Sequence, residues 1–205
     1  VDNLYSLETV PDDMAETLFD LCGQVALMLE NAQLFARLSE IARHDDLTGL
    51  FRSGYFYEVL QEHLCMLKQY QGSSGLLIMD IDHFKQINDT CGHLVGDVVL
   101  TNAAALLREI LRPKDMACRM GGDEFIVLFA DCDESRIVDL AGEVLQRFRG
   151  HQFRLADGRK LYITVSIGVT ILSSDTIHWQ HAISRADQAL YHSKAHGRNQ
   201  FSFFK

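Results

Sequence analysis

The sequence predicts an α+β or α/β sandwich, in which helices pack against a sheet. Helical and strand patterns alternate along the chain after residue 44, as they do in layered folds that combine both element types. Apolar residues make up 47% and charged residues 23% of the 205 residues, a composition typical of globular and not of disordered chains. This length suits one large domain, or one domain with an appendage.

The first element expected is one long helix over residues 12–43. Pro11 stops its extension upstream, and Asp12 or Asp13 can cap its first turn. Its apolar and small side chains follow a heptad seam, and a second seam overlaps the first near the end. This pattern favours a parallel coiled-coil dimer, with packing against the chain's own domain as the alternative. The first seam is Met14, Leu18, Leu21, Val25, Met28, Ala32 and Phe35, and the second is Leu27, Asn31, Leu34, Leu38 and Ile41.

The remaining elements follow one another after His44. Helical periodicity places Phe56, Leu60, Leu64 and Leu67 on one face of the next helix, and short apolar runs mark the strands. Gly121-Gly122-Asp123-Glu124 reads as the turn of a hairpin. The expected helices span residues 54–69, 95–110, 134–149 and 179–195, and the expected strands span 76–81, 115–120, 125–129, 161–170 and 200–204.

Charge and cysteine content exclude several classes of protein. Lys and Arg number 19 and Asp and Glu 28, a net charge of −9, which argues against nucleic acid or an anionic membrane as a partner. A small phosphorylated ligand remains compatible, because it needs only a few cations. The five cysteines form no C-x-x-C pair, and no apolar run approaches a membrane span. We expect a soluble cytoplasmic chain without direct membrane contact.

Two acidic pairs are candidates for chemistry. Alternation along the strand predicts that Asp80 and Asp82 project to one face, and Asp123-Glu124 lies in the hairpin turn. If these strands are neighbours, three or four carboxylates converge, and hard divalent cations relieve their repulsion. Two such ions about 3.5–4 Å apart can activate a hydroxyl and stabilise a leaving oxygen in phosphoryl transfer. Taken alone, each pair is equally compatible with a solvated strand end or an ordinary turn.

Longer stretches around these pairs strongly resemble the GGDEF family of diguanylate cyclases, in the family's order. The resemblance runs from about His44 to the C-terminus. It implies residues 1–43 as a signalling helix with a sensor remnant, and residues 44–205 as a catalytic domain. It also implies a central, mostly antiparallel sheet flanked by helices, similar to nucleotide cyclases and the polymerase palm. The matching stretches are residues 46–50, 80–93, 96–97, 119–125 and 195–199.

The resemblance further implies condensation of two GTP into cyclic di-GMP and two pyrophosphates, across a dimer of such domains. Asp123 and Glu124 would be catalytic. Two Mg²⁺ ions, with Mn²⁺ as an alternative, would be held by Asp80, the Ile81 carbonyl, Asp123 and Glu124. Asn88 and Asp97 would bind the base, and an acidic Asp97 suits the N1–H and 2-amino donors of guanine, which adenine lacks. The substrate-binding set would be Phe84, Lys85, Asn88, His93, Asp97, Gly121, Gly122, Lys194 and Arg198, with Lys85, Lys194 and Arg198 on the triphosphate.

Arg112-Pro113-Lys114-Asp115 fits the family's Arg-x-x-Asp product-inhibition motif. Arg112 would clamp cyclic di-GMP, and Asp115 would accept from its guanine. A further arginine often completes such sites, and here Glu143-Val144 occupies the expected place, with Arg136 and Arg147 on either side. Another departure is Arg52-Ser53-Gly54, which puts the local helix start in question.

Three functions are therefore weighed from the sequence. The first is an active cyclase that dimerises through its N-terminal helix. The second is a catalytically silent receptor for GTP or cyclic di-GMP that signals through that helix, and the third is a mere dimerisation module. Residues 1–4, with the Leu29–Leu34 stretch, also resemble the end of a GAF sensor domain.

Overall fold

The computed structural model describes residues 12–155 and 158–204 of the chain. It divides into two units, Val1–Ala42 and Arg43–Lys205, each of which is described by itself. The sensor-like residues 1–4, the cap at Asp12 or Asp13, and the side chains of Phe35, Leu38 and Ile41 lie outside what the structure describes.

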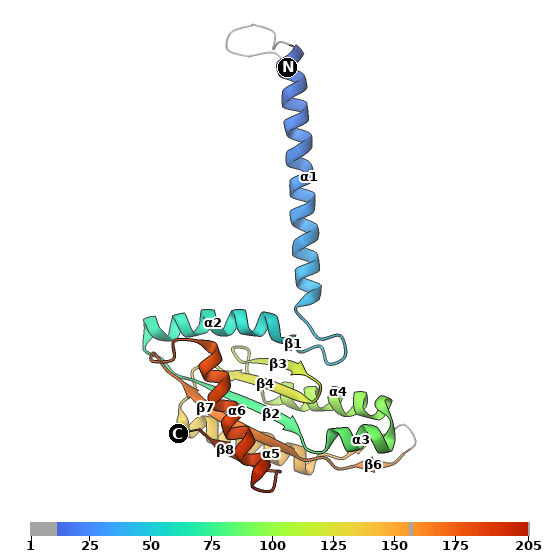
Figure 1. Ribbon diagram of the computed structural model, residues 1–205, viewed down its shortest axis with the longest axis vertical. Helices are drawn as coiled ribbons and strands as arrows, with labels where there is room; N and C mark the ends of the chain where they lie inside the picture. Colours follow the sequence, from blue (N-terminus) through green and yellow to red (C-terminus); the bar gives the residue numbers. More distant parts are fainter. Residues whose placement is uncertain (1–11, 156–157, 205) are drawn as a thin grey trace. The chain divides into compact units, whose positions relative to one another are not determined.

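The first unit is the helix α1, Asp12–Ala42, which runs without a break for 31 residues (Figure 1). The described apolar side chains of both seams are exposed on this chain, Met28 at 68% and Leu27 at 59%. The long helix is confirmed, and the apolar seams have no cover within the described part of their own unit.

The second unit is built on a six-stranded sheet with the order β1-β3-β4-β2-β7-β8. The pairs β3/β4, β4/β2 and β2/β7 are antiparallel, and only the outer strands β1 and β8 pair in parallel. The expected mostly antiparallel sheet is therefore confirmed. The strands are β1 Phe51–Arg52, β2 Ser74–Ile81, β3 Met116–Gly121, β4 Glu124–Phe129, β7 Val165–Leu172 and β8 Phe201–Phe203.

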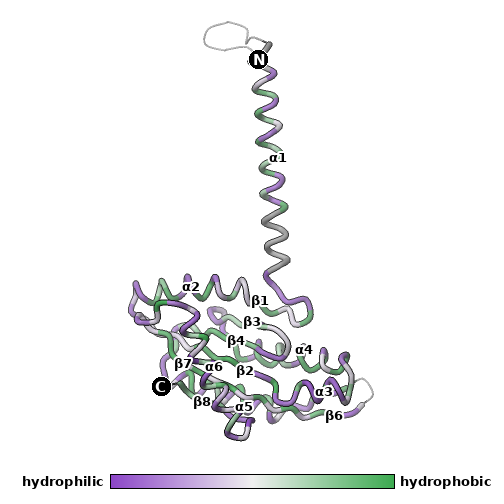
Figure 2. Tube along the Cα trace, viewed as in Figure 1, coloured by the Kyte–Doolittle hydropathy of each residue, from purple (hydrophilic) through white to green (hydrophobic). Residues whose placement is uncertain are grey.

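Helices cover both faces of this sheet (Figure 1). Because side chains alternate along a strand, Leu77 and Met79 of β2 enter one core and Leu76 and Ile78 the other. Figure 2 shows green, hydrophobic stretches along the strands, and helices in which green and purple alternate along the trace. The first core includes α3 Phe84–Cys91, α4 His93–Ile110 and α5 Glu134–Gly150, and the second includes α2 Ser53–Tyr70 and α6 Trp179–Ala195.

Most element predictions are confirmed, including the predicted face of α2, whose four apolar residues are all buried. This helix begins at Ser53, so the unusual Arg52-Ser53-Gly54 start does not prevent it. The short helix α3 was not expected, because it has only eight mostly polar residues, among which Phe84 is the buried one.

The single strand expected over residues 161–170 is wrong. The structure splits it into β6, Lys160–Leu161, and β7, Val165–Leu172. The reason is that β6 pairs with β5, Phe153–Arg154, in a separate two-stranded ribbon, whereas β7 joins the main sheet.

Candidate active site

The two acidic segments meet at the end of β2. Because β2 and β4 are antiparallel neighbours, Asp80 lies directly opposite Glu124 on the same face of the sheet. The amide of Ile81 donates to the carbonyl oxygen of Asp123 at 3.3 Å, which holds the turn against the strand end. Four predicted metal-site residues, Asp80, Ile81, Asp123 and Glu124, are thus adjacent through backbone pairing.

The hairpin turn is fixed by glycine and by one arginine. Gly122 has φ +55°, a conformation that favours glycine, and the ladder shifts register between Arg119 and Gly121. Arg119 donates to the Gly122 carbonyl through Nε at 3.0 Å and Nη2 at 2.7 Å, and its Nη1 pairs with Asp45 at 3.2 Å. The sequence did not predict that Arg119 would link Asp45 to the hairpin turn, because Asp45 and Arg119 are 74 residues apart.

The facing carboxylates, with Asp123 beside them, carry more negative charge than the single ammonium of Lys194 offsets. Burial and the nearby Asp123 raise the pKa of Asp80, although the ion pair with Lys194 opposes the shift; its Nζ lies 2.8 Å from Asp80 Oδ2. Burial and the charge of Asp80 likewise raise the pKa of Glu124. A raised pKa means that the charged forms are disfavoured where they stand, and a divalent cation would reverse this.

The donor set fits a hard divalent cation, because it consists of carboxylate oxygens beside a backbone carbonyl. Over residues 12–155 and 158–204, no three acidic, histidine or cysteine side chains are already gathered closely enough to form a complete metal site. The structure places Asp80 and Glu124 face to face with Asp123 in the adjoining turn, and Lys194 supplies positive charge to Asp80.

Asp82 lies next to this acidic group, and its charge is among those that raise the pKa of Asp80, but its own oxygens are engaged by protein donors. It is 4% exposed, and its carboxylate accepts from Thr164 Oγ1 and Ser166 Oγ, each at 2.7 Å, and from the amide of Asn199 at 3.0 Å. Of the three or four carboxylates expected to converge, Asp82 is therefore the one that protein donors already satisfy. Its oxygens are already engaged by protein donors, and nothing in the local sequence signals partners that lie 82 to 117 residues away.

A second part of the site lies between α3 and α4. The side-chain oxygen of Asn88 is buried and has no hydrogen-bond partner, which is rare for a buried polar atom. Gly96 makes room for it, since a Cβ at that position would collide with Asn88 and press on Phe84. Asp97 follows directly and is exposed, as is His93 at the start of α4. This part of the site therefore combines a buried acceptor without a partner, the Asn88 oxygen, with the exposed carboxylate of Asp97.

The three predicted phosphate-binding cations differ in placement. Lys194, on α6, is at the acidic pair. Lys85 on α3 and Arg198 after α6 are exposed, and within the described residues neither side chain has an ion pair. Arg198 has φ +60°, which is unusual for a residue with a side chain.

The Arg112–Asp115 pair is formed in the structure. Arg112 donates to both carboxylate oxygens of Asp115 at 3.0 Å and to the carbonyl of Ala130 at 2.7 Å. Arg112 also lines a pocket of about 560 Å³ together with Arg136. Arg147 is engaged elsewhere, with Glu143 and Glu109. Of the two arginines that the sequence left open, the structure places Arg136 beside Arg112.

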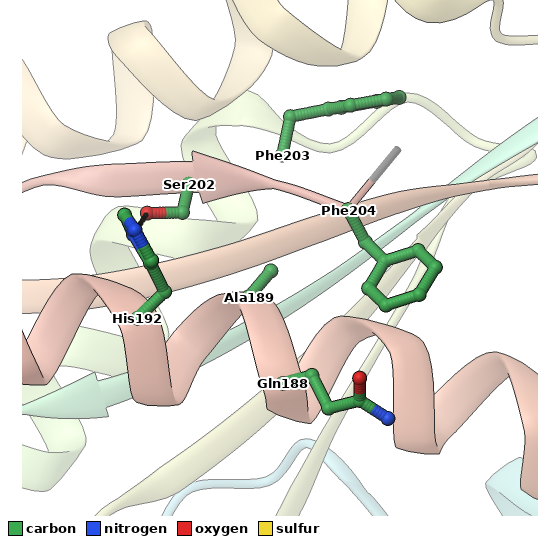
Figure 3. A pocket seen from close by; sticks show the side chains of 6 residues that line it. All are labelled: Gln188, Ala189, His192, Ser202, Phe203 and Phe204. Atoms are coloured by element: carbon green, nitrogen blue, oxygen red, sulfur yellow. Dashed lines mark hydrogen bonds between the residues drawn. The ribbon is translucent and has the colours of Figure 1, made fainter.

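Not every hollow in the molecule belongs to this site. A pocket of about 540 Å³ is lined by residues of α6 and of the last strand, β8, with the residue after it. In Figure 3, His192 is hydrogen-bonded to Ser202, while the rings of Phe203 and Phe204 line the pocket. None of the predicted site residues lines it.

A mostly antiparallel sheet between helices, with an acidic hairpin at one strand end, defines the class of GGDEF-type α+β domains. Residues 42–200 match the family model described as "Diguanylate cyclase, GGDEF domain". The chain belongs to this family.

Three similar proteins illustrate the relationship. Diguanylate cyclase A of Treponema denticola is 34% identical over 189 residues, covering 91% of this chain and 50% of that protein. Cyclic di-GMP phosphodiesterase NbdA of Pseudomonas aeruginosa is 38% identical over 183 residues, covering 87% and 23%. The solved coiled coil and GGDEF domain of DgcB from Caulobacter crescentus, in complex with c-di-GMP, has a TM-score of 0.80 at 26% identity, covering 91% and 98%.

The chain spans half of the length of the first of these curated relatives and less than a quarter of the second. Within the described residues, no helix is both long and apolar enough to cross a bilayer.

Proposed function

We propose that this chain is the catalytic part of a diguanylate cyclase, which joins two GTP molecules into cyclic di-GMP and releases two pyrophosphates. The observation that carries the proposal is the face-to-face placement of Asp80 and Glu124 beside Asp123, with the pKa values of Asp80 and Glu124 raised. The carboxylate and carbonyl oxygens gathered there suit Mg²⁺.

The chain's own residues have separate tasks in this scheme. Asp80, Asp123, Glu124 and the Ile81 carbonyl would hold the cations, two per site. Bound Mg²⁺ would lower the pKa of a substrate hydroxyl and neutralise charge on the leaving phosphate. The 3′-oxygen of one GTP attacks the α-phosphorus of the other, the bond to pyrophosphate breaks, and Asp123 accepts the hydroxyl proton. Glu124 supports the same site.

Guanine recognition is assigned to Asn88 and Asp97. The orphaned Asn88 oxygen is an acceptor without a donor, and the guanine N1–H and 2-amino groups are donors at an adjacent edge. Phe84 and His93 would flank the nucleotide, and Gly121 and Gly122 would let it approach the turn backbone. Satisfying a buried acceptor gives selectivity, because a base that lacks the donors leaves the acceptor unpaired.

The triphosphate is assigned to Lys85, Lys194 and Arg198. Lys194 already contacts Asp80 at 2.8 Å, so its ammonium stands where phosphate oxygens would approach metal-binding carboxylates. Arg198 offers a planar fork that suits phosphate oxygens.

Each domain holds one GTP in this scheme, so two domains must face each other. We assign this chain's dimer contact to α1. Its exposed seams are the apolar surface that a second copy would cover, and pairing raises the effective concentration of the facing sites.

Product inhibition is assigned to Arg112, Asp115 and Arg136. Arg112 and Arg136 line the pocket together with Asp131 and Asp133, and the buried side chain of Asp115 pairs with Arg112. The test of this assignment is calorimetric titration of cyclic di-GMP into the wild type and into Arg112→Ala. Equal affinities would contradict the assignment.

This preformed pocket also favours a second candidate function, a non-catalytic receptor for cyclic di-GMP. Incubation with GTP and Mg²⁺ separates the two candidates, because only the cyclase yields cyclic di-GMP and pyrophosphate. Asp123→Ala is expected to abolish turnover and leave the fold intact. Absence of product from wild-type protein at high concentration would reject the cyclase.

A further inference from the structure

The loop that follows α6 has a strained backbone. Gly197, Arg198 and Asn199 all have positive φ, at 108°, 60° and 49°. This conformation is costly for residues with a Cβ, so two consecutive non-glycine residues there require support from the surrounding structure. The middle residue is Arg198, whose side chain carries one of the positive charges assigned to the triphosphate.

Asp82 supplies the support from the end of β2. The amide of Asn199 donates to Asp82 Oδ2 at 3.0 Å, and Thr164 Oγ1 donates to the same oxygen at 2.7 Å. Ser166 Oγ donates to the other oxygen at 2.7 Å. A buried carboxylate is stable only when donors of this kind surround it. The carboxylate therefore ties the loop backbone to two residues beside the acidic site.

Arg149 holds the same residue from the other side. At the end of α5, its Nε donates to the side-chain oxygen of Asn199 at 2.8 Å, and its Nη2 donates to the Asn199 carbonyl. The amide, carbonyl and side chain of Asn199 are thus all engaged. Arg149 itself is exposed, so it contributes contacts and not core packing.

The anchored loop lies close to the catalytic carboxylates. Lys194, in the last turn of α6, contacts Asp80 at 2.8 Å, and Asp80 is two residues before Asp82. We propose that Asp82 and Arg149 are positioning residues that fix the 197–199 loop, so that Arg198 presents its guanidinium to the triphosphate of bound GTP. The inference rests on the proposed function, in which Arg198 binds that triphosphate.

The test uses Arg149→Ala in the full chain, since removal of an exposed side chain does not open the core. Arg147→Ala is its matched control, on the same helix turn but paired with Glu109 and Glu143. Calorimetry would measure binding of a GTP analogue whose α–β phosphate bridge cannot react, and competition would measure binding of guanosine. We expect Arg149→Ala to weaken the analogue about tenfold, as for loss of a charge-assisted hydrogen bond, and to leave guanosine unchanged. Arg147→Ala should change neither.

A double-mutant cycle shows whether the effect passes through Arg198. Arg149→Ala in an Arg198→Ala background should cause no further loss of analogue affinity, because the positioned group is already gone. Losses that add would overturn the inference. Asp82→Asn should also speed hydrogen exchange of the Asn199 amide, which needs no nucleotide.

The two proposals fail in different ways. If the wild type binds the analogue and Arg149→Ala binds it equally well, the positioning role is wrong and the proposed function stands. If the wild type does not bind the analogue, the proposed function is wrong, and the role of Arg198 falls with it.

Discussion

Two carboxylates at the end of β2, Asp80 and Asp82, have opposite environments although only Ile81 separates them. Asp82 is buried, and three protein donors satisfy its oxygens. Asp80 faces Glu124, its pKa is raised by burial and by Asp123, and its cationic partner is Lys194. A carboxylate whose charge the fold has already balanced stabilises the fold, whereas one left in excess negative charge is available to a cation.

The largest expected effect is a loss of activity in Asp80→Asn, without the loss of stability that we expect for Asp82→Asn. Asp80→Asn should lower the rate of cyclic di-GMP formation about a thousandfold, equivalent to about 4 kcal/mol, because in the proposed scheme it removes a ligand of the cations that promote the reaction. Stability should not fall, since the variant removes a disfavoured buried charge. Production of cyclic di-GMP and urea denaturation measure the two quantities.

Asp82→Asn is the counterpart. It should lower the free energy of unfolding by about 1.5–3 kcal/mol, because it weakens hydrogen bonds to a charged group. If Asp80→Asn destabilised the protein more than Asp82→Asn, the contrast between the two carboxylates would be wrong.

A second prediction extends the contrast from carboxylates to a neutral acceptor. Gly96→Ala places a methyl group against the buried Asn88 oxygen, so guanine recognition should suffer. We expect GTP affinity to fall by about tenfold or more. This is the effect of losing one buried hydrogen bond to the ligand, because the guanine donor is then left without its partner. Fluorescent GTP titration measures this. Gly92→Ala would not be a fair control, because Gly92 has φ +87°. Gly142→Ala, in the open on α5, is the matched variant and should bind normally.

A third prediction concerns Asp45, a carboxylate whose charge is satisfied by hydrogen bonds from Thr48 and an ion pair with Arg119. Although burial works to raise it, hydrogen bonds from Thr48 and Arg119 hold the pKa of Asp45 below its ordinary 3.8. Such a group stabilises the fold above its unfolded pKa, and this stability is lost as pH falls through the lowered folded pKa. Asp45→Asn should therefore cost about 1–2 kcal/mol at neutral pH. The difference in stability between this variant and the wild type should shrink below about pH 4. Thermal unfolding measured across a range of pH checks this.

A pH-independent cost would mean that Asp45 acts by packing and not by its charge. Asp46→Asn is the matched control, since its partner Arg52 is exposed and the pair contributes little.

The smallest expected effect applies the comparison to apolar surface. The described apolar seams of α1 are exposed, whereas the apolar faces of α2 and α6 are buried in the core. Disulfide cross-linking through Leu21→Cys or through Leu27→Cys should lock two different coil registers and give turnover rates that differ several-fold. Exposed Cys22 and Cys65 must first be replaced, by Ser, to prevent competing disulfides. Identical rates would argue against a role for register.

Much of the fold was predictable, because the signals involved are local. The helical period placed the buried face of α2, and α6 has the predicted bounds, Trp179–Ala195. The hairpin was evident from two glycines between apolar runs. The short polar helix α3 and the break before β7 were not evident, because α3 buries little and the break depends on a partner strand.

The sequence by itself predicted the residues to which we assign the chemistry, since Asp80, Asp123 and Glu124 stand in an ordered set of motifs along the chain. Only the tertiary structure decided which acid is free to act. Asp80 and Asp82 are alike in sequence, but Asp82 is balanced by donors more than 80 residues away, as Asn199 is held by Arg149 across 50 residues. A periodic pattern reports which side of an element is buried. It carries no record of which distant donor will meet a given oxygen, because that meeting depends on how the elements pack.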